Sequence, residues 1–165
     1  MNIPEPILPG LSTDEFYMNL ALSVSRKAFP TCLPNPPVGC VLVRNGSVLC
    51  EGYTHGPGQF HAEAHALSQV QGFLDDTTAY VTLEPCSFRG RTSSCALSLI
   101  ERRIKRVVVA LVDPDSRNNG NGINLLREAG VEVTIGVLDI PTRDFIAPYL
   151  DLASNKVSAC TCDNH

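Results

Sequence analysis

The residues His61-Ala62-Glu63, followed by Glu84-Pro85-Cys86 and then by Cys95, decide the organisation of this chain. One imidazole and two thiols are three ligands suited to zinc, and a tetrahedral zinc ion with three protein ligands keeps one position for water. Catalytic zinc sites are built in this way, whereas structural zinc sites have four protein ligands. The sequence therefore predicts that His61, Cys86 and Cys95 bind Zn²⁺ at a site where chemistry takes place.

Glu63 is the candidate catalytic residue of this predicted site. If His61 opens a helix, a carboxylate two positions later points about 200° further round the helix axis, so it does not share the ligand direction of His61. It can instead reach a water on the ion and move protons for it. A His-x-Glu motif followed by Pro-Cys-x-x-Cys is the signature of zinc-dependent base deaminases, in which the Glu is the general acid and base. Here eight residues, instead of two, separate Cys86 from Cys95.

Several further blocks of sequence, in order along the chain, resemble the pyrimidine deaminase domain of riboflavin biosynthesis. The blocks are Pro34-Asn35-Pro36-Pro37-Val38-Gly39, His61-Ala62-Glu63-Ala64-His65-Ala66-Leu67, Thr82-Leu83-Glu84-Pro85-Cys86-Ser87, Gly90-Arg91-Thr92 and Val112-Asp113-Pro114. The resemblance extends from about Phe16 to Phe145. It implies a zinc-dependent hydrolase that releases ammonia from an aminopyrimidine precursor of riboflavin, 2,5-diamino-6-ribosylamino-pyrimidinone 5′-phosphate or its ribityl form. No redox cofactor is expected.

The resemblance also implies which residues bind the substrate. Asn35 lies between prolines and by itself is typical of a turn, but the Pro-Asn-Pro loop of the family contacts substrate. Arg91 occupies the place of a basic substrate-binding residue. The family usually has a histidine where Thr54 stands, which His55 would replace with an offset of one residue. It usually has another histidine where Phe88 stands, and because Phe88 cannot donate a hydrogen bond, a deaminase of another small heterocycle stays open as an alternative.

Two further alternatives belong to other classes. A tRNA or DNA deaminase is disfavoured by the formal net charge of −4 and by the long gap between the two cysteines, since polyanion binders usually present a basic face. A non-catalytic zinc module for protein interaction would need a fourth ligand, and His55 is the least unsuitable candidate. The expected partner is thus a small pyrimidine, with or without a phosphate, and not nucleic acid or a membrane; a homo-oligomer is plausible from the family.

The composition is typical of one globular domain. The chain has 165 residues, 44% of them hydrophobic, with no apolar stretch of the length needed for a signal peptide or a membrane span, so cytoplasmic residence is expected. Seven cysteines are an odd number whose spacing favours metal ligation over disulfides. Cys32, Cys40 and Cys50 are expected in the core, whereas Cys160 and Cys162 lie in the polar C-terminal segment.

Hydrophobic periodicity and turn residues predict an α/β fold. A helix from a cap at Ser12 to about Ala28, with Phe16, Leu20 and Val24 facing inward, precedes a hairpin. Strand-helix repeats follow, and together they give a three-layer α/β/α arrangement with a five-stranded mixed sheet, which resembles the cytidine deaminase fold. The expected strands are 39–43, 48–53, 79–83, 107–112 and 131–135, and the expected helices are 61–71, 96–103, 123–129 and 141–150. The expected domain limits are an extended lead-in at 1–12, a zinc-dependent deaminase domain at 13–150 and a flexible tail at 151–165.

Overall fold

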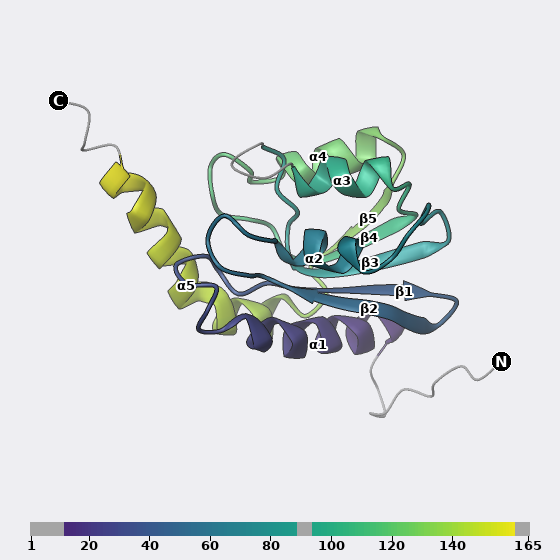
Figure 1. Cartoon of the computed structure of the whole chain (residues 1–165), viewed down its shortest axis with the longest axis horizontal. Coiled ribbons are helices and arrows are strands. Elements are labelled where there is room, and N and C mark those ends of the chain that lie inside the picture. Colours follow the sequence, from purple (N-terminus) through teal and green to yellow (C-terminus); the bar gives the residue numbers. More distant parts are fainter. Residues whose placement is uncertain (1–11, 89–93, 161–165) are drawn as a thin grey trace.

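A mixed five-stranded sheet forms the centre of the computed structural model, which describes the backbone of residues 12–88 and 94–160 and the side chains of 12–88 and 94–150 (Figure 1). The strands are β1 (Gly39–Arg44), β2 (Ser47–Tyr53), β3 (Thr77–Leu83), β4 (Arg106–Leu111) and β5 (Glu132–Ile135). Their order is β2-β1-β3-β4-β5; β1 pairs antiparallel with β2 and β3, whereas β3, β4 and β5 run parallel. The predicted mixed sheet is confirmed.

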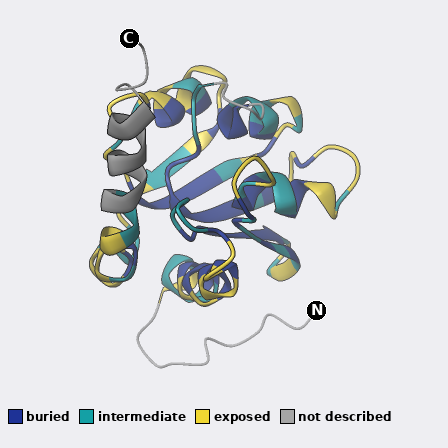
Figure 2. Cartoon of the chain, turned by 60° about the vertical axis from the view of Figure 1, so that its left-hand side comes forward, coloured by how far each residue is buried: buried dark blue, intermediate teal, exposed yellow. Residues whose placement is uncertain are grey.

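Helices cover both faces of this sheet, as Figure 1 shows. Helices α2 (Ala62–Ser68), α3 (Cys95–Glu101) and α4 (Asn121–Glu128) lie on one face, and α1 (Thr13–Ser25), continued by a 3₁₀ turn at Arg26–Ala28, covers the other. Helix α5 (Asp139–Cys160) begins beside α1, where Phe145 contacts Arg26 and Tyr149 contacts Phe29. The three-layer α/β/α architecture is therefore as predicted, with the strands as its most buried layer (Figure 2).

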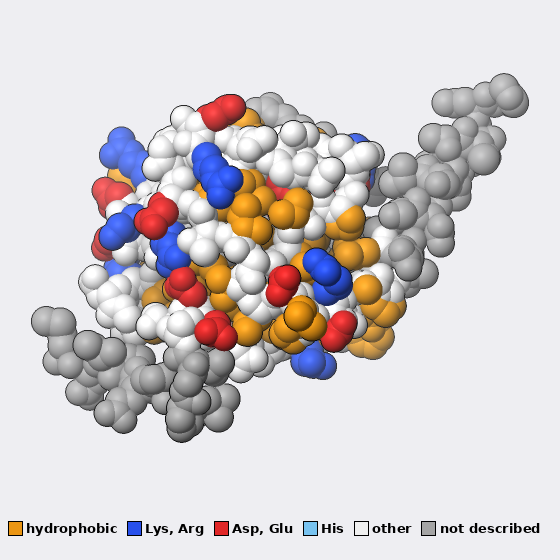
Figure 3. All heavy atoms as spheres, turned by 180° about the vertical axis from the view of Figure 1, so that it is seen from behind, with side chains coloured by type: hydrophobic (Ala, Val, Ile, Leu, Met, Phe, Trp, Pro, Cys, Tyr) orange, Lys and Arg blue, Asp and Glu red, His pale blue; other side chains and the backbone are white. Residues whose placement is uncertain are grey.

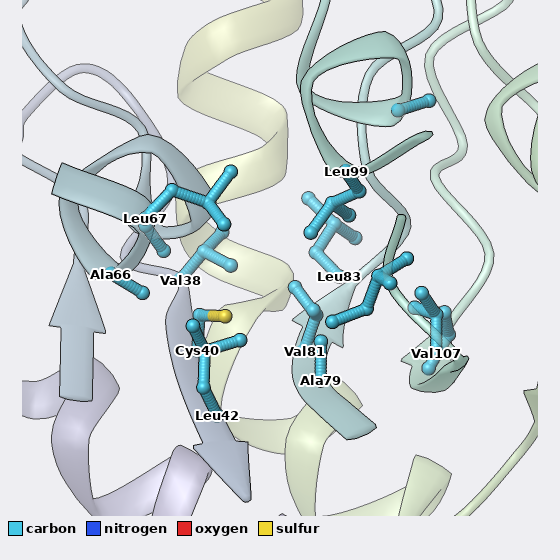
Figure 4. Packing of buried hydrophobic residues seen from close by; sticks show 14 of the residues in the cluster. Val38, Cys40, Leu42, Ala66, Leu67, Ala79, Val81, Leu83, Leu99 and Val107 are labelled. Carbon is cyan, nitrogen blue, oxygen red and sulfur yellow. The ribbon is translucent and has the colours of Figure 1, made fainter. Parts of the chain in front are cut away.

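The larger part of the core lies between the sheet and the α2, α3 and α4 layer. Strand residues such as Cys40, Val81 and Val107 meet Leu67 of α2 and Leu99 of α3 there (Figure 4). A second cluster, on the α1 face, is built from the alternate strand positions, because successive side chains of a strand point to opposite faces. The predicted burial of the first three cysteines is confirmed, since they are all free and buried: Cys32, Cys40 and Cys50.

Helix α1 begins at the predicted capping box, and its predicted inward residues lie in or against the core. Ser12 and Glu15 exchange the two hydrogen bonds of the box, which satisfy backbone donors at the helix start. Of the predicted inward residues, Val24 is buried in the core cluster of this face, and Phe16 and Leu20 are partly buried and pack against it. The cluster also contains Tyr17, Met18 and Ala21. The helix approaches β1 closely at Gly39, where a Cβ atom would lie 2.0 Å from the carbonyl oxygen of Ala21.

Helix α2 presents the zinc motif, and it is shorter than predicted. A Cβ atom on Gly52 of β2 would lie 2.2 Å from the carbonyl oxygen of Ala62, so this glycine lets the helix N-terminus rest on the strand. The helix ends at Ser68 instead of about Gln71. Arg102 accounts for this end, because its guanidinium donates to the carbonyl oxygens of Leu67, Val70 and Gly72 at 3.2, 2.7 and 2.8 Å.

Of the two predicted chain ends, only part of the C-terminal one can be compared with the structure. The lead-in at 1–12 lies almost entirely outside the described residues. The backbone of 151–160, which the sequence assigned to the tail, continues α5 to Cys160. Leu152, Ala153 and Lys156 are good helix formers, which favours this continuation, and Pro148 is accommodated inside the helix. The remaining domain limits stay predictions.

Basic and acidic side chains are interspersed on the face shown in Figure 3, with hydrophobic side chains between them. A search of the described residues found no helix with the length and apolar character to span a membrane.

Candidate active site

His61, Cys86 and Cys95 come together at one edge of the sheet. His61 is the N-cap residue of α2, Cys86 follows the end of β3, and Cys95 is the first residue of α3. The Nδ1 atom of His61 lies 3.8 Å from the Sγ of Cys86 and 3.4 Å from the Sγ of Cys95, and the three donor atoms lie within 4.8 Å of one another. Three residues predicted as ligands from separate parts of the sequence thus face a common point.

These distances fit a zinc ion. Bonds of about 2.3 Å to sulfur and about 2.05 Å to nitrogen, at tetrahedral angles, place a nitrogen and a sulfur ligand about 3.6 Å apart. The two observed separations, 3.8 and 3.4 Å, bracket that value. With one neutral ligand and two thiolates, His61, Cys86 and Cys95 would hold the ion, and His61 and Cys86 also line the pocket described below.

The surroundings favour the thiolate of Cys86. Hydrogen bonding with the Cys95 thiol, and then with His61 and with the Cys95 backbone N–H, lowers the pKa of Cys86 below its usual range. That backbone N–H donates to the Cys86 sulfur at 3.3 Å. The same pairing raises the pKa of His61, with its hydrogen bond to Cys86 as the main cause. A thiolate is the form that ligates metal, so Cys86 is in the form suited to a cation, whereas the hydrogen bond with Cys86, and then burial, raise the pKa of Cys95.

Glu63 lies beside this cluster and is almost fully buried, with 4% of its surface exposed. Burial, and then the negative charge of Cys86, raises its pKa to about 7. A carboxyl group with a raised pKa can both take and give a proton near neutral pH, which is what a general acid and base must do. Helix α2 therefore supplies His61 at its cap and Glu63 in its first turn, as the sequence predicted.

A pocket of about 250 Å³ opens onto His61, Cys86 and Glu63. It lies beyond the C-terminal ends of β3 and β4, which is where open α/β sheets bind small molecules. The pocket brings the predicted Asn35 and Phe88 together with residues from the loop after β4. The other lining residues are Pro36, Val38, Thr54, Ala62, Leu83, Glu84, Asp113, Pro114, Asp115, Arg117 and Leu150.

The structure places His55 outside this pocket. Its ring stacks on Tyr53 and contacts His65, with ring centroids 5.1 and 4.3 Å away, and its buried Nε2 has no hydrogen-bond partner within the described part of the chain. Thr54 faces the pocket instead, where its Oγ1 accepts a hydrogen bond from the Val38 backbone N–H at 3.0 Å. Thr54 and His55 follow the end of β2 at Tyr53, and although they are adjacent in the sequence only Thr54 lines the pocket, so an offset of one residue does not reproduce the place of a side chain.

Two other predicted residues have different outcomes. Arg91 lies outside the described residues, 12–88 and 94–160, so its role stays a prediction. His65, one turn after His61, has a packing role. Its Nδ1 accepts a hydrogen bond from the Tyr53 backbone N–H at 3.1 Å, and its ring contacts Tyr53 and Phe60.

Glu84 has a structural role at the site that the sequence analysis missed. Its buried carboxylate accepts hydrogen bonds from the backbone N–H groups of Asp113, Gly120 and Ile123 at 3.1, 2.9 and 3.1 Å. Gly120 is the N-cap residue of α4 and has no side chain to cap it, so Glu84 supplies the acceptor that the helix start lacks. The link holds the loop after β4 to the end of β3, two residues before Cys86.

Asn118 completes this link and was also missed. Its side chain is fully buried; Oδ1 accepts from the Ser87 and Gly122 N–H groups, both at 3.2 Å, and Nδ2 donates to the Pro85 carbonyl oxygen at 3.2 Å. Asn118 thus holds both neighbours of Cys86 in place. Glu84 lies two residues before Cys86 in the sequence, and this position could have indicated a role at the site. The Asn-rich loop that contains Asn118 is typical of an ordinary turn and gave no such indication.

The comparison with protein families agrees with this geometry. Residues 11–111 match the family described as the cytidine and deoxycytidylate deaminase zinc-binding region. The fold, the His-Cys-Cys cluster and this match define the class: the chain belongs to the zinc-binding cytidine and deoxycytidylate deaminase family.

The relatives of this chain include riboflavin biosynthesis proteins. The chain is 45% identical over 128 residues to the riboflavin biosynthesis protein RibD of Haemophilus influenzae, covering 78% of this chain and 34% of that protein. It is 40% identical over 124 residues to the chloroplastic protein PYRD of Arabidopsis thaliana, covering 75% of this chain and 29% of that protein. The chain spans about a third of the length of these relatives.

Solved structures show the same relationship. RibD of Acinetobacter baumannii superposes with a TM-score of 0.77 at 39% identity, covering 84% of this chain and 39% of that one. A Thermotoga maritima protein described as a diaminohydroxyphosphoribosylaminopyrimidine deaminase and 5-amino-6-(5-phosphoribosylamino)uracil reductase superposes with a TM-score of 0.79 at 33% identity, covering 87% and 42%. The recognised family and the cytidine deaminase-like fold are therefore confirmed.

Proposed function

We propose that this chain is a zinc-dependent hydrolytic deaminase of an aminopyrimidine precursor of riboflavin, 2,5-diamino-6-ribosylamino-pyrimidinone 5′-phosphate or its ribityl form. The observation that carries the proposal is the position of the buried Glu63 carboxyl beside His61, Cys86 and Cys95, at a pocket large enough for a pyrimidine. The RibD relatives support the choice of heterocycle.

The reaction replaces a ring amine by a carbonyl: water adds to the carbon that carries the amine, and ammonia leaves. Zinc held by His61, Cys86 and Cys95 would lower the pKa of a bound water and so supply a nucleophile near neutral pH. Glu63 takes the proton from the attacking water and delivers it to the ring nitrogen. The same carboxyl group then carries the second proton to the departing amine, so that no proton is gained or lost.

The pocket walls would orient the ring. Asn35 has an amide that can both donate and accept hydrogen bonds, and its backbone N–H is already satisfied by the Cys32 carbonyl oxygen at 2.9 Å, which fixes the loop. Val38, Leu83 and Phe88 supply apolar surface for a flat heterocycle. We assign Asn35 to substrate contact on these grounds, and Arg91 on the family resemblance alone.

We also propose that the chain acts in the cytoplasm on this small molecule, without nucleic acid or membrane, and that copies of it associate. Sedimentation of the purified chain would show a dimer or a larger assembly, and a monomer at micromolar concentration would contradict the last part.

The test is ammonia release from the proposed substrates by the wild type and by Glu63→Gln. The variant keeps the shape of the side chain but cannot accept the proton, so turnover should fall by about 10²- to 10⁴-fold while the zinc content stays unchanged. Glu51→Gln, an exchange on β2 outside the pocket, is the matched control and should keep full activity.

Two outcomes would contradict the proposal. Equal turnover by Glu63→Gln and by the wild type would favour a zinc module without catalysis. Activity on other pyrimidines or purines in a panel, with none on the riboflavin precursors, would favour a deaminase of another small heterocycle.

A further inference from the structure

The proposed function leaves open what binds the substituent that extends from the pyrimidine ring. We propose that Arg117, held in place by Phe88 and Asp115, is a specificity-determining residue that donates hydrogen bonds to oxygen atoms of this substituent. The inference rests on the proposed deaminase function and adds a substrate contact that neither the zinc motif nor the family resemblance assigned.

Arg117 is fixed at the pocket by two different contacts. Its guanidinium carbon lies 4.5 Å from the centroid of the Phe88 ring, which is a cation–π contact between the loop after β4 and the loop after Cys86. On its other side, Nη2 lies 2.6 Å from Oδ2 of Asp115, and Nε lies 3.1 Å from Oδ1 of the same carboxylate. All three side chains line the pocket that contains His61 and Glu63.

Backbone hydrogen bonds fix Asp115 in place, so the ion pair of Asp115 with Arg117 does not join two mobile surface side chains. Its Oδ1 accepts the backbone N–H of Arg117 at 3.0 Å, and its backbone N–H donates to Oδ1 of Asp113 at 2.9 Å. Asp113 is in turn bound through its backbone N–H to the buried Glu84. The guanidinium is therefore anchored to the same network that positions Cys86.

This geometry leaves part of the guanidinium available for a ligand. An arginine side chain has five N–H donors, and the hydrogen bonds of Arg117 with the described residues use Nε and Nη2. The two donors of Nη1 are left for solvent or substrate. Arg117 has 53% of its side chain exposed and lies at the rim of the pocket. A substituent on a bound pyrimidine ring would extend out of the pocket past this rim.

The charges nearby define the chemistry of the ligand. Among the described residues that line the pocket, Arg117 is the only Lys or Arg, and the acidic residues there are Glu63, Glu84, Asp113 and Asp115. A group rich in oxygen acceptors would therefore be drawn to Arg117. Sugar hydroxyls and a phosphate share this acceptor chemistry, and the experiment below separates them. This arrangement also gives Phe88 a function. Its ring packs against the Arg117 guanidinium, whereas the histidine that the family usually has at this position could donate a hydrogen bond.

The experiment compares three substrates with the same diaminopyrimidinone ring: one with an unsubstituted amine at C6, one with ribosylamine there, and one with ribosylamine 5′-phosphate. For Arg117→Ala we expect kcat/KM to fall about 10- to 100-fold for a substrate that carries the bound group, mainly through KM, and less than about twofold for the bare ring. A loss only with phosphate identifies the phosphate as the ligand, and a loss with both sugar substrates identifies the sugar hydroxyls.

Arg103→Ala is the matched control, because Arg103 makes a comparable contact with Phe73, 4.0 Å from the ring centroid, outside the pocket. It should leave all three values unchanged, and zinc content and thermal unfolding would show that each variant is folded. An equal loss on the bare ring, or no loss on any substrate, would overturn the inference while the wild type still deaminates. No turnover of any of the three by the wild type would overturn the proposed function and this inference with it.

Discussion

Gly122 lies so close to Pro85 that a Cβ atom on Gly122 would be 1.9 Å from the carbonyl oxygen of Pro85. The first turn of α4 therefore touches the backbone just before Cys86. Asn118 reinforces the contact, since it binds both the Gly122 N–H and the Pro85 carbonyl group. The position of a zinc ligand thus depends on a glycine far along the chain.

Gly122→Ala should shift α4 away from the Cys86 loop. We expect the free energy of unfolding to fall by about 1–3 kcal/mol, because the added methyl group overpacks the contact, and zinc affinity to fall about tenfold. Urea unfolding and chelator competition measure the two effects. Gly56→Ala is the control, since its Cβ would meet no atom closer than 3.6 Å. Equal zinc affinities of the two variants would contradict the proposed coupling.

Glu84→Gln should weaken the same link without changing its shape. A glutamine places an NH₂ group against backbone N–H donors that now bind carboxylate oxygens, so one buried donor loses its acceptor. The expected cost is about 1–3 kcal/mol in the free energy of unfolding, measured by urea titration. Glu128→Gln, on the exposed side of α4, should have little effect; a similar cost in both variants would mean that Glu84 does not act as a helix cap.

Removing a ligand should remove the metal. Cys95→Ser is expected to lose most bound zinc after dialysis, because a hydroxyl group is a poor substitute for a thiolate, and to unfold at a lower temperature than the zinc-loaded wild type. Zinc per chain is measured by atomic spectroscopy. Cys32→Ala, a change at a buried cysteine outside the cluster, should keep its zinc. Treating the wild type with a strong chelator should reproduce the thermal shift of Cys95→Ser.

The ion pair of Asp14 with Arg106 predicts a pH dependence of stability. Both guanidinium Nη atoms donate to the Asp14 carboxylate at 2.8 Å, and the hydrogen bond with Arg106 is the main cause that lowers the pKa of Asp14. A lowered folded-state pKa means that the stabilisation is complete above the unfolded value of 3.8 and is lost as the pH falls through the folded value.

Asp14→Asn should therefore lower the free energy of unfolding by about 1–3 kcal/mol at pH 7, and the difference from wild type should shrink below about pH 4. Urea unfolding of the metal-free proteins across this range measures it without interference from zinc loss. Asp75→Asn, at an exposed turn before β3, is the control. A difference that grows toward low pH would contradict the sign of this linkage.

The sequence by itself predicted the candidate zinc ligands, the candidate catalytic residue Glu63, the three layers and a mixed sheet of five strands. It could do so because these features follow from local spacing: apolar periodicity identifies helices and strands, and His61, Cys86 and Cys95 stand at the ends of such elements. The capping box at Ser12 was predictable for the same reason.

Only the tertiary structure decided how the site is held and lined. Glu84 binds backbone groups 29 to 39 residues later, Asn118 reaches back to Pro85, and Arg117 lies over Phe88. The direction of Thr54 into the pocket and of His55 away from it also depended on how the elements pack. The physical reason is that local spacing restricts backbone conformation and burial, whereas contacts between distant loops depend on the path of the whole chain.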